Sequence, residues 1–324
     1  MTQYIIRRLL QAIPLLVGIS LIVFLLMQLS PGGPLALTEA VGSGTRMTPE
    51  ELERLRASFG LDAPIHIRYI RWLGAVLQGD FGNSYNTGRP ALVVVLERLP
   101  VTLLVTLTAW AIAIFLALVG GILAALYHNS VIDYALTTTA FLGISTPRFW
   151  SAIMLLFVFS YSLKWLPAVG LYDPRQEYSG LAAVWDRILH LILPVTVMTF
   201  YTFASLTRYV RSSMLEVLNS DYLRTARAKG VYERQVIWVH ALKNAAIPVI
   251  TVLTLQLPHL VAGSAIVEAI FAIPGMGRLY LESANSRDYP ILLTVMMLIS
   301  TLIILSNLLA DILYGLLDPR VRYQ

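Results

Sequence analysis

The sequence contains no cysteine among its 324 residues, and only 13% of its residues are charged. The absence of cysteine excludes disulfide scaffolds, thiolate metal sites and cysteine nucleophiles. A soluble domain usually spends about a quarter of its residues on charge. The charges that are present gather in a few segments and leave long uncharged gaps between them. This pattern is typical of a chain whose solvent is lipid.

Motifs for enzymatic chemistry are also missing. The chain has no Gly-x-x-x-x-Gly-Lys-Ser/Thr loop and no Gly-x-Gly-x-x-Gly fingerprint after a strand, the two common phosphate-binding patterns. Its histidines are scattered without metal-ligand spacing: His66, His128, His190, His240 and His259. Carboxylates inside the apolar stretches, which ion-coupled carriers place near the bilayer midplane, are almost absent. We therefore expect a non-catalytic chain without metal or cofactor, which would need another subunit to power any pumping.

Six uncharged stretches are long enough for a transmembrane helix, which takes about 20 residues. They are Leu9–Met27, Leu99–Tyr127, Tyr134–Leu163, Ile188–Thr207, Asn244–Val267 and Ile291–Ala310. The third contains Pro147, and we interpret it as one span that is tilted or kinked there. The prediction is an all-α integral membrane protein with six transmembrane helices.

The distribution of lysine and arginine predicts the orientation. With both termini in the cytoplasm, most basic residues of the short loops and tails fall on the cytoplasmic side, among them Arg7, Arg8, Arg320 and Arg322. The segment Ser30–Arg98 then lies outside. It contains a capping-box pattern at Thr48-Pro49-Glu50-Glu51, which predicts a helix to about Ser58, and an apolar helical stripe over His66–Leu77. We expect this segment to form a small helical cap.

The second polar segment, Tyr209–Lys243, lies inside in this topology. Ser220 is placed to cap a helix with Asp221 in its first turn, basic residues later and Gly230 at its end, which is the order that helix ends favour. Physics alone leaves two interpretations open. The helix either lies on anionic lipid or docks onto a cytoplasmic partner.

Several motifs together resemble one family. Tyr222-Leu223-Arg224-Thr225-Ala226-Arg227-Ala228-Lys229-Gly230, with His240–Asn244 and Ile247-Pro248 after it, is similar to the cytoplasmic "EAA" loop of ABC-importer permeases, in the form found in the dipeptide/oligopeptide/nickel family. The similarity extends along the chain. It includes Leu61–Pro64, Gly79–Ser84, Pro147 with Phe149-Trp150, Glu268 with Pro274–Leu279, and Asp318–Arg322. The long outer segment resembles that of the first of two permease subunits.

Three positions depart from the general EAA pattern. Arg224 stands where the leading glutamate is usual, Thr225 stands where alanine is usual, and Lys243 stands in place of the closing proline, which is displaced to Pro248. The match to the generic motif is therefore weaker than the match to this branch of the family.

The resemblance implies a type I ABC importer transmembrane fold in the cytoplasmic (inner) membrane of a prokaryote. It also implies four kinds of partner: a second homologous permease, two cytoplasmic ATP-binding subunits, an extracytoplasmic solute-binding protein and the lipid bilayer, with no nucleic acid. The chain would divide into residues 1–30 (N-terminus and first span), 31–98 (outer cap), 95–316 (permease core with a coupling loop over 210–243) and 317–324 (cytoplasmic tail).

The candidate site residues follow from this assignment. The ATPase-coupling loop comprises Asp221, Arg224, Thr225, Ala226, Arg227, Ala228, Lys229 and Gly230. The candidates for lining the pathway or forming a gate are Arg148, Gln256, His259 and Glu268. For each of these the alternative is structural. Arg148 would mark a kink or reach toward the membrane interface, and the others would pack against neighbouring helices.

The function implied is half of the translocation pathway for peptides, with ATP hydrolysis performed by separate subunits. Nickel chelates, glutathione and opines remain open as solutes. Two other classes of protein remain as alternatives. A self-sufficient secondary carrier would need midplane carboxylates and an inverted repeat, which the sequence does not show, and a membrane-embedded hydrolase would need a nucleophile, base or metal set, which it also lacks.

Overall fold

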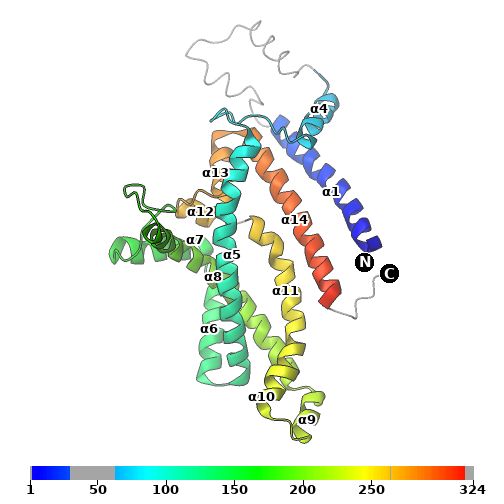
Figure 1. Ribbon diagram of the computed structural model, residues 1–324, viewed down its shortest axis with the longest axis vertical. Coiled ribbons are helices and arrows are strands. Elements are labelled where there is room, and N and C mark those ends of the chain that lie inside the picture. The colour runs from blue at the N-terminus through cyan, green and yellow to red at the C-terminus, as the bar shows by residue number, and fades with distance from the viewer. Residues whose placement is uncertain (1, 30–62, 263, 318–324) are drawn as a thin grey trace. The chain divides into compact units, whose positions relative to one another are not determined.

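A computed structural model describes residues 2–29, 63–262 and 264–317 (Figure 1). The described residues form two compact units. Unit 1 contains Val101–Arg278 and Leu305–Gln324, and unit 2 contains Thr2–Pro100 and Leu279–Ile304. Apart from one isolated bridge between Asn83 and Pro90, the regular structure of the described ranges is helical. The longer helices are α1 (Thr2–Leu29), α4 (Ile65–Leu77), α5 (Ala91–Leu126), α6 (Val131–Ser145), α8 (Leu181–Leu218), α11 (Leu242–Ala262), α13 (Met276–Ser286) and α14 (Tyr289–Leu317).

Short helical pieces connect these elements in unit 1. They are α7 (Arg148–Leu155), which continues into the π-helix η2 (Leu156–Ser162); α9 (Asp221–Ala228); α10 (Glu233–Gln235), which continues through the π-helix η3 (Val236–Ala241) into α11; and α12 (Ala265–Ile270). The long helix α8 is the centre of this unit, because α6, α7 and α11 all pack against it (Figure 1).

Two apolar clusters stabilise unit 1. The first joins α5, α7, α8 and α12 through buried residues such as Val105, Ala152 and Phe271. The second joins α5, α8, α9, η3 and α11 around Met214 and Leu223. The second cluster packs the short helix α9 against the long helices of the unit.

Glycines allow close helix contacts in unit 1. A Cβ atom added at Gly121 in α5 would lie 2.6 Å from the Cβ of Val210 in α8, and one added at Gly143 in α6 would lie 2.6 Å from the Cβ of Ala204. Real Cβ atoms do not approach so closely, so both positions need glycine. Small residues at helix contacts are typical of membrane helices.

In unit 2, polar contacts position α4 and the loop before α5. The Tyr69 hydroxyl lies 2.8 Å from Ser20 Oγ of α1, and Arg68 is hydrogen-bonded to Gln28. The buried Asp288 carboxylate accepts hydrogen bonds from Ser84 Oγ at 2.5 Å and from the backbone N–H of Tyr85 at 3.1 Å. The helix expected over His66–Leu77 is therefore confirmed as α4, whereas the one expected from Thr48 lies outside the described residues.

Four of the six predicted apolar stretches lie almost entirely within single helices. Asn244–Val267 is instead divided between α11, which ends at Ala262, and α12, which begins at Ala265, and Tyr134–Leu163 is also interrupted. Within the described residues, Ala91–Leu126, Leu181–Leu218, Glu233–Leu257 and Tyr289–Ile312 are long and apolar enough to cross a membrane, and Leu10–Leu26 forms a shorter apolar helix. The stretch over Tyr134–Leu163 is not one tilted helix. It is two helical pieces, Val131–Ser145 and Arg148–Ser162, bent by 104° at Pro147. The predicted kink is thus in the right place but is much sharper than a tilted span requires.

Candidate functional site

Helix α9 ends in a hydrogen-bonded motif that depends on Gly230. Gly230 has φ +77°, its N–H donates to the Arg227 carbonyl at 3.0 Å, and the Val231 N–H donates to the Ala226 carbonyl at 3.2 Å. This pair of bonds is the Schellman motif, in which a left-handed residue satisfies the last carbonyls of a helix. The predicted helix end at Gly230 is confirmed.

The start of α9 differs from the prediction. Ser220 occupies the N-cap position in an extended conformation, but its side chain makes no capping bond to the helix. Its hydroxyl instead donates to the Val217 carbonyl at 2.5 Å. The preceding turn at the end of α8 therefore takes the hydrogen bond that was expected to cap α9, and that prediction is wrong.

One side of α9 packs and the rest is exposed. Leu223 is fully buried in the second apolar cluster and Ala226 is partly buried against it. The remaining residues of the predicted coupling loop are exposed, namely Asp221, Arg224, Thr225, Arg227, Ala228, Lys229 and Gly230. A rigidly anchored helix with a polar outer face is suited to contact with a partner.

The basic residues of α9 differ in how they are held. Arg227 forms two hydrogen bonds to the Glu233 carboxylate, at 2.9 and 3.1 Å. These bonds raise the pKa of the guanidinium and hold the side chain in one position. Arg224 lies 3.6 Å from Asp221, but both side chains are largely exposed, so this pair contributes little.

A polar cavity of about 330 Å³ lies within unit 1, among four helices. Its walls come from α5, α7, α8 and α11. The lining residues are Thr106, Ala109, Trp110, Arg148, Met198, Tyr201, Thr202, Ser205, Gln256 and Leu260. Two predicted pathway candidates from distant parts of the sequence, Arg148 and Gln256, thus line the same cavity.

Arg148 is the first residue of α7, immediately after the bend at Pro147. Its guanidinium carbon lies 3.7 Å from the centre of the Tyr201 ring of α8, in a cation–π contact. The break in the helix therefore places a cation against the wall of the cavity. The interpretation of Arg148 as a residue at a kink is correct in position, but the kink also brings it to this cavity.

Glu268 does not line the polar cavity. It is buried, and its carboxylate accepts hydrogen bonds from Thr102 Oγ1 at 2.9 Å and from the Arg278 backbone N–H at 3.0 Å. Thr102 Oγ1 in turn accepts from the Met276 N–H at 2.8 Å. A Cβ atom at Gly275 would lie 2.4 Å from Glu268 Oε2. This arrangement holds the start of α13, so the structure places Glu268 in a structural network.

The fourth pathway candidate, His259, belongs to α11, but its side chain lies outside the described residues. Sequence reasoning missed Trp110, Tyr201, Thr202 and Ser205 as lining residues. A weak signal was present, because Tyr201, Thr202 and Ser205 recur along one stretch of α8 at a helical spacing that shares a face.

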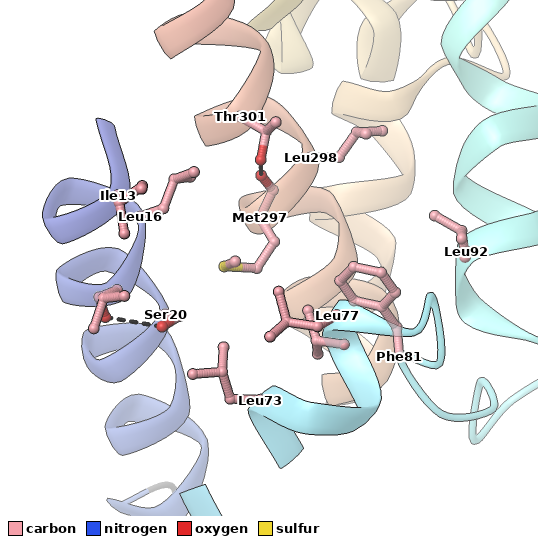
Figure 2. Close-up of a pocket in the computed structure, with 12 residues that line it drawn as sticks. Ile13, Leu16, Ser20, Leu73, Leu77, Phe81, Leu92, Met297, Leu298 and Thr301 are labelled. Carbon is pink, nitrogen blue, oxygen red and sulfur yellow. Dashed lines mark hydrogen bonds between the residues drawn. The ribbon is translucent and has the colours of Figure 1, made fainter. Parts of the chain in front are cut away.

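A larger cavity of about 580 Å³ lies in unit 2, among α1, α4, α5 and α14 (Figure 2). Its walls are almost entirely apolar, with Leu73, Leu77 and Phe81 among them. The two hydroxyls in it are engaged, since Ser20 Oγ donates to the Val17 carbonyl at 2.8 Å and Thr301 Oγ1 to the Met297 carbonyl at 2.8 Å (Figure 2). This cavity offers little to a polar solute, and the smaller cavity of unit 1 is the candidate solute site.

Comparison with known proteins gives matches over the whole chain. Residues 117–323 match the family described as binding-protein-dependent transport system inner membrane component, and residues 1–106 match the N-terminal region of such components. The oligopeptide transport system permease protein AppB of Bacillus subtilis (strain 168) is 41% identical over 324 residues, 100% of both chains. A putative peptide permease of Brucella suis biovar 1 is 38% identical over 325 residues, 99% of both chains.

The fold also matches a solved transporter. A structure titled as an inward-facing conformation of the MetNI methionine ABC transporter superposes with a TM-score of 0.53 at 17% identity, covering 69% of this chain and 96% of that one. The likeness is one of fold. Together with the sequence matches, it shows that the chain belongs to the family of binding-protein-dependent transport system inner membrane components, the non-catalytic permease subunits of ABC importers.

Proposed function

We propose that this chain forms half of the translocation pathway of an ATP-driven importer of peptides. The observation that carries the proposal is the end-to-end similarity to peptide permeases at 38 to 41% identity. In the full transporter, a solute-binding protein delivers the peptide and a second permease completes the pathway. Two ATP-binding subunits supply the energy.

Within this proposal, α9 is the contact for one ATP-binding subunit. The helix is anchored by Leu223 and closed by the motif at Gly230, so force applied to its exposed face is transmitted to α8 and α11 through the second apolar cluster. Closure of the ATP-binding subunits would shift the population of outward- and inward-open states by moving the helices that line the pathway.

Arg148 and Gln256, which line the polar cavity, are the pathway residues in this proposal, and His259 stays a candidate. Glu268 acts as a structural residue. We further propose that both termini and α9 are cytoplasmic. Single cysteines introduced in place of Ser43 and Asn219 should then react with an impermeant reagent from opposite sides of the membrane. Reaction of both cysteines from the same side would contradict this orientation.

The proposed function is tested with the complete transporter in proteoliposomes. ATP-dependent uptake of an equimolar dipeptide mixture is measured by mass spectrometry. It should require the binding protein, the permease subunits and the ATP-binding subunits. Peptide uptake that persists without the ATP-binding subunits would support a secondary carrier. Failure of the intact, ATP-hydrolysing complex to take up any peptide would overturn the assignment of solute.

A further inference from the structure

The polar cavity contains hydrogen-bonding groups that the described residues of the protein do not engage. Among the described residues, none forms a hydrogen bond with the side chains of Thr202, Ser205 or Gln256, and the buried Trp110 Nε1 has no partner. The side chains of Thr202, Ser205 and Gln256 are half-buried in the cavity wall, so their polar groups are accessible to a molecule that enters the cavity. Trp110 Nε1, in contrast, is fully buried.

Arg148 adds a cation to this set. In the described ranges, the Arg148 guanidinium contacts the Tyr201 ring, and no carboxylate pairs with it. The contact holds the guanidinium carbon over the ring, and because Arg148 is exposed its N–H donors remain accessible. The guanidinium N–H groups of Arg148 are therefore available to bind a carboxylate in a bidentate arrangement.

Other arginines of the chain show what is missing at Arg148. Arg211 is bound by both oxygens of Asp133, Arg227 by both of Glu233, and Arg89 by both of Glu97. An ionisable side chain within membrane segments is costly and usually meets an opposite charge or a functional ligand. Arg148 is exposed, lines the cavity and has no carboxylate beside it within the described ranges, so the counter-charge is left to another molecule.

We infer that the polar cavity binds the terminal carboxylate of the transported peptide through Arg148. This inference rests on the proposed function and names the group that the pathway recognises. Peptides differ in their side chains, but each unmodified one carries a carboxylate at its end, so a fixed guanidinium recognises all of them. The side chains of Gln256, Thr202 and Ser205 both donate and accept hydrogen bonds, as a peptide amide requires.

The size of the cavity agrees with binding of one end of a peptide. Its volume of about 330 Å³ is near the lower limit of small-molecule pockets, roughly 300–1,000 Å³. The space suits a dipeptide or the last residues of a longer chain. The aromatic rings of Trp110 and Tyr201 and the side chains of Met198 and Leu260 provide apolar walls that tolerate different side chains.

The absence of cysteine from this chain allows a direct test. Ser205→Cys places one thiol on the cavity wall, and its alkylation in the purified permease–ATPase complex, without the binding protein, is followed by peptide mass spectrometry. Dialanine should protect the thiol at a concentration about tenfold lower than dialanine amide, because a charge-assisted pair is lost with the carboxylate. Thr301→Cys, in the apolar cavity, should be protected by neither compound.

Second substitutions in the Ser205→Cys background assign the effect to Arg148. Arg148→Gln should abolish the preference for the acid, and Arg148→Lys should weaken it, since lysine keeps the charge but loses the planar fork. Arg208→Gln is the matched control. Arg208, in α8, also faces an aromatic ring, Phe141 at 6.0 Å, but it does not line the cavity.

Three outcomes would overturn the inference: equal protection by acid and amide, no protection by either, or a preference that survives Arg148→Gln. None of them bears on whether peptides are carried, because ATP-dependent uptake by the complete transporter decides that separately. Assembly of each variant with the ATP-binding subunits, checked by size-exclusion chromatography, shows that the permease is folded. The comparison of dialanine with dialanine amide in the Ser205→Cys protein leaves Arg148 unchanged, so it tests the inference even if an Arg148 variant fails to fold.

Discussion

Arg211 and Arg148 both belong to unit 1, and their surroundings are opposite. Arg211 in α8 makes two bonds, at 2.6 and 2.8 Å, to Asp133, whose side chain is almost fully buried. Asp133 also accepts from the Asn129 N–H at 3.0 Å and from Thr137 Oγ1 at 3.1 Å. Arg148 has an aromatic ring, a polar cavity and, within the described ranges, no carboxylate.

This difference separates a structural charge from a charge available to a ligand. Around Arg211 the protein satisfies the cation and the oxygens of Asp133, and the pair joins α6 to α8. Around Arg148, the neighbouring side chains of Thr202, Ser205 and Gln256 also have no hydrogen-bond partner among the described residues. The two regions should therefore respond differently to substitution, the first in stability and the second in transport.

The largest expected effect is on the paired region. Asp133→Asn leaves Arg211 without its counter-charge and should destabilise the complex by about 3 kcal/mol, the lower end of the range for a broken buried pair, because Arg211 is partly exposed. Thermal unfolding of the purified complex measures this loss. Asp221→Asn is the control, since its exposed pair with Arg224 should leave the unfolding temperature unchanged. Equal behaviour of the two variants would contradict the structural role of Asp133.

The next prediction separates the polar cavity from the apolar one. Thr202→Trp fills the polar cavity and should lower ATP-dependent peptide uptake at least about tenfold, because the bulky ring obstructs the solute. Thr301→Trp is the same substitution in the apolar cavity of unit 2 and should change uptake less than about twofold. If Thr301→Trp were the more harmful change, the solute would have been assigned to the wrong cavity.

A smaller effect is expected at the end of α9. Gly230→Val places a β-branched residue at φ +77° and should cost about 1–2 kcal/mol of local strain, although a Cβ atom there meets nothing within 4 Å. We expect ATP hydrolysis stimulated by the loaded binding protein to fall while the permease still inserts in the membrane. Gly88→Val, at φ +68° and equally free of neighbours, is the matched control outside α9. Normal stimulation in Gly230→Val would contradict the proposed coupling.

Local features of the fold were largely predictable from the sequence. The end of α9 at Gly230 and the bend at Pro147 each depend on a residue with restricted or unusual backbone preferences, so a short stretch of sequence determines them. The lengths of the spans were predicted less well. Helix α8 covers Leu181–Leu218, whereas the expected span was Ile188–Thr207, because a search for uncharged residues stops at Arg187 and Arg208 although the helix continues through both.

The polar cavity was only partly predictable. Arg148 and Gln256 were named because charge and amide groups are unusual in apolar stretches, but Trp110 and Tyr201 look like ordinary membrane-helix residues. Their relation to Arg148 depends on the packing of α5 and α8 against α7, which no local pattern specifies. Glu268 differs from these residues. A carboxylate near a span end is consistent with a gate or with an interface residue, and its bonds to Thr102 and the Arg278 backbone place it in a buried structural network.

The contrast between the two arginines is tested most directly by measuring unfolding temperature and ATP-dependent dipeptide uptake on the same preparation of Arg148→Gln. We predict that the unfolding temperature stays at the wild-type value, because the described structure contains no carboxylate that the substitution would leave unpaired. Uptake of dipeptides with a free carboxyl end should fall severalfold or more. A lowered unfolding temperature with normal uptake would show that Arg148 is a structural residue and would contradict its assignment to the peptide pathway.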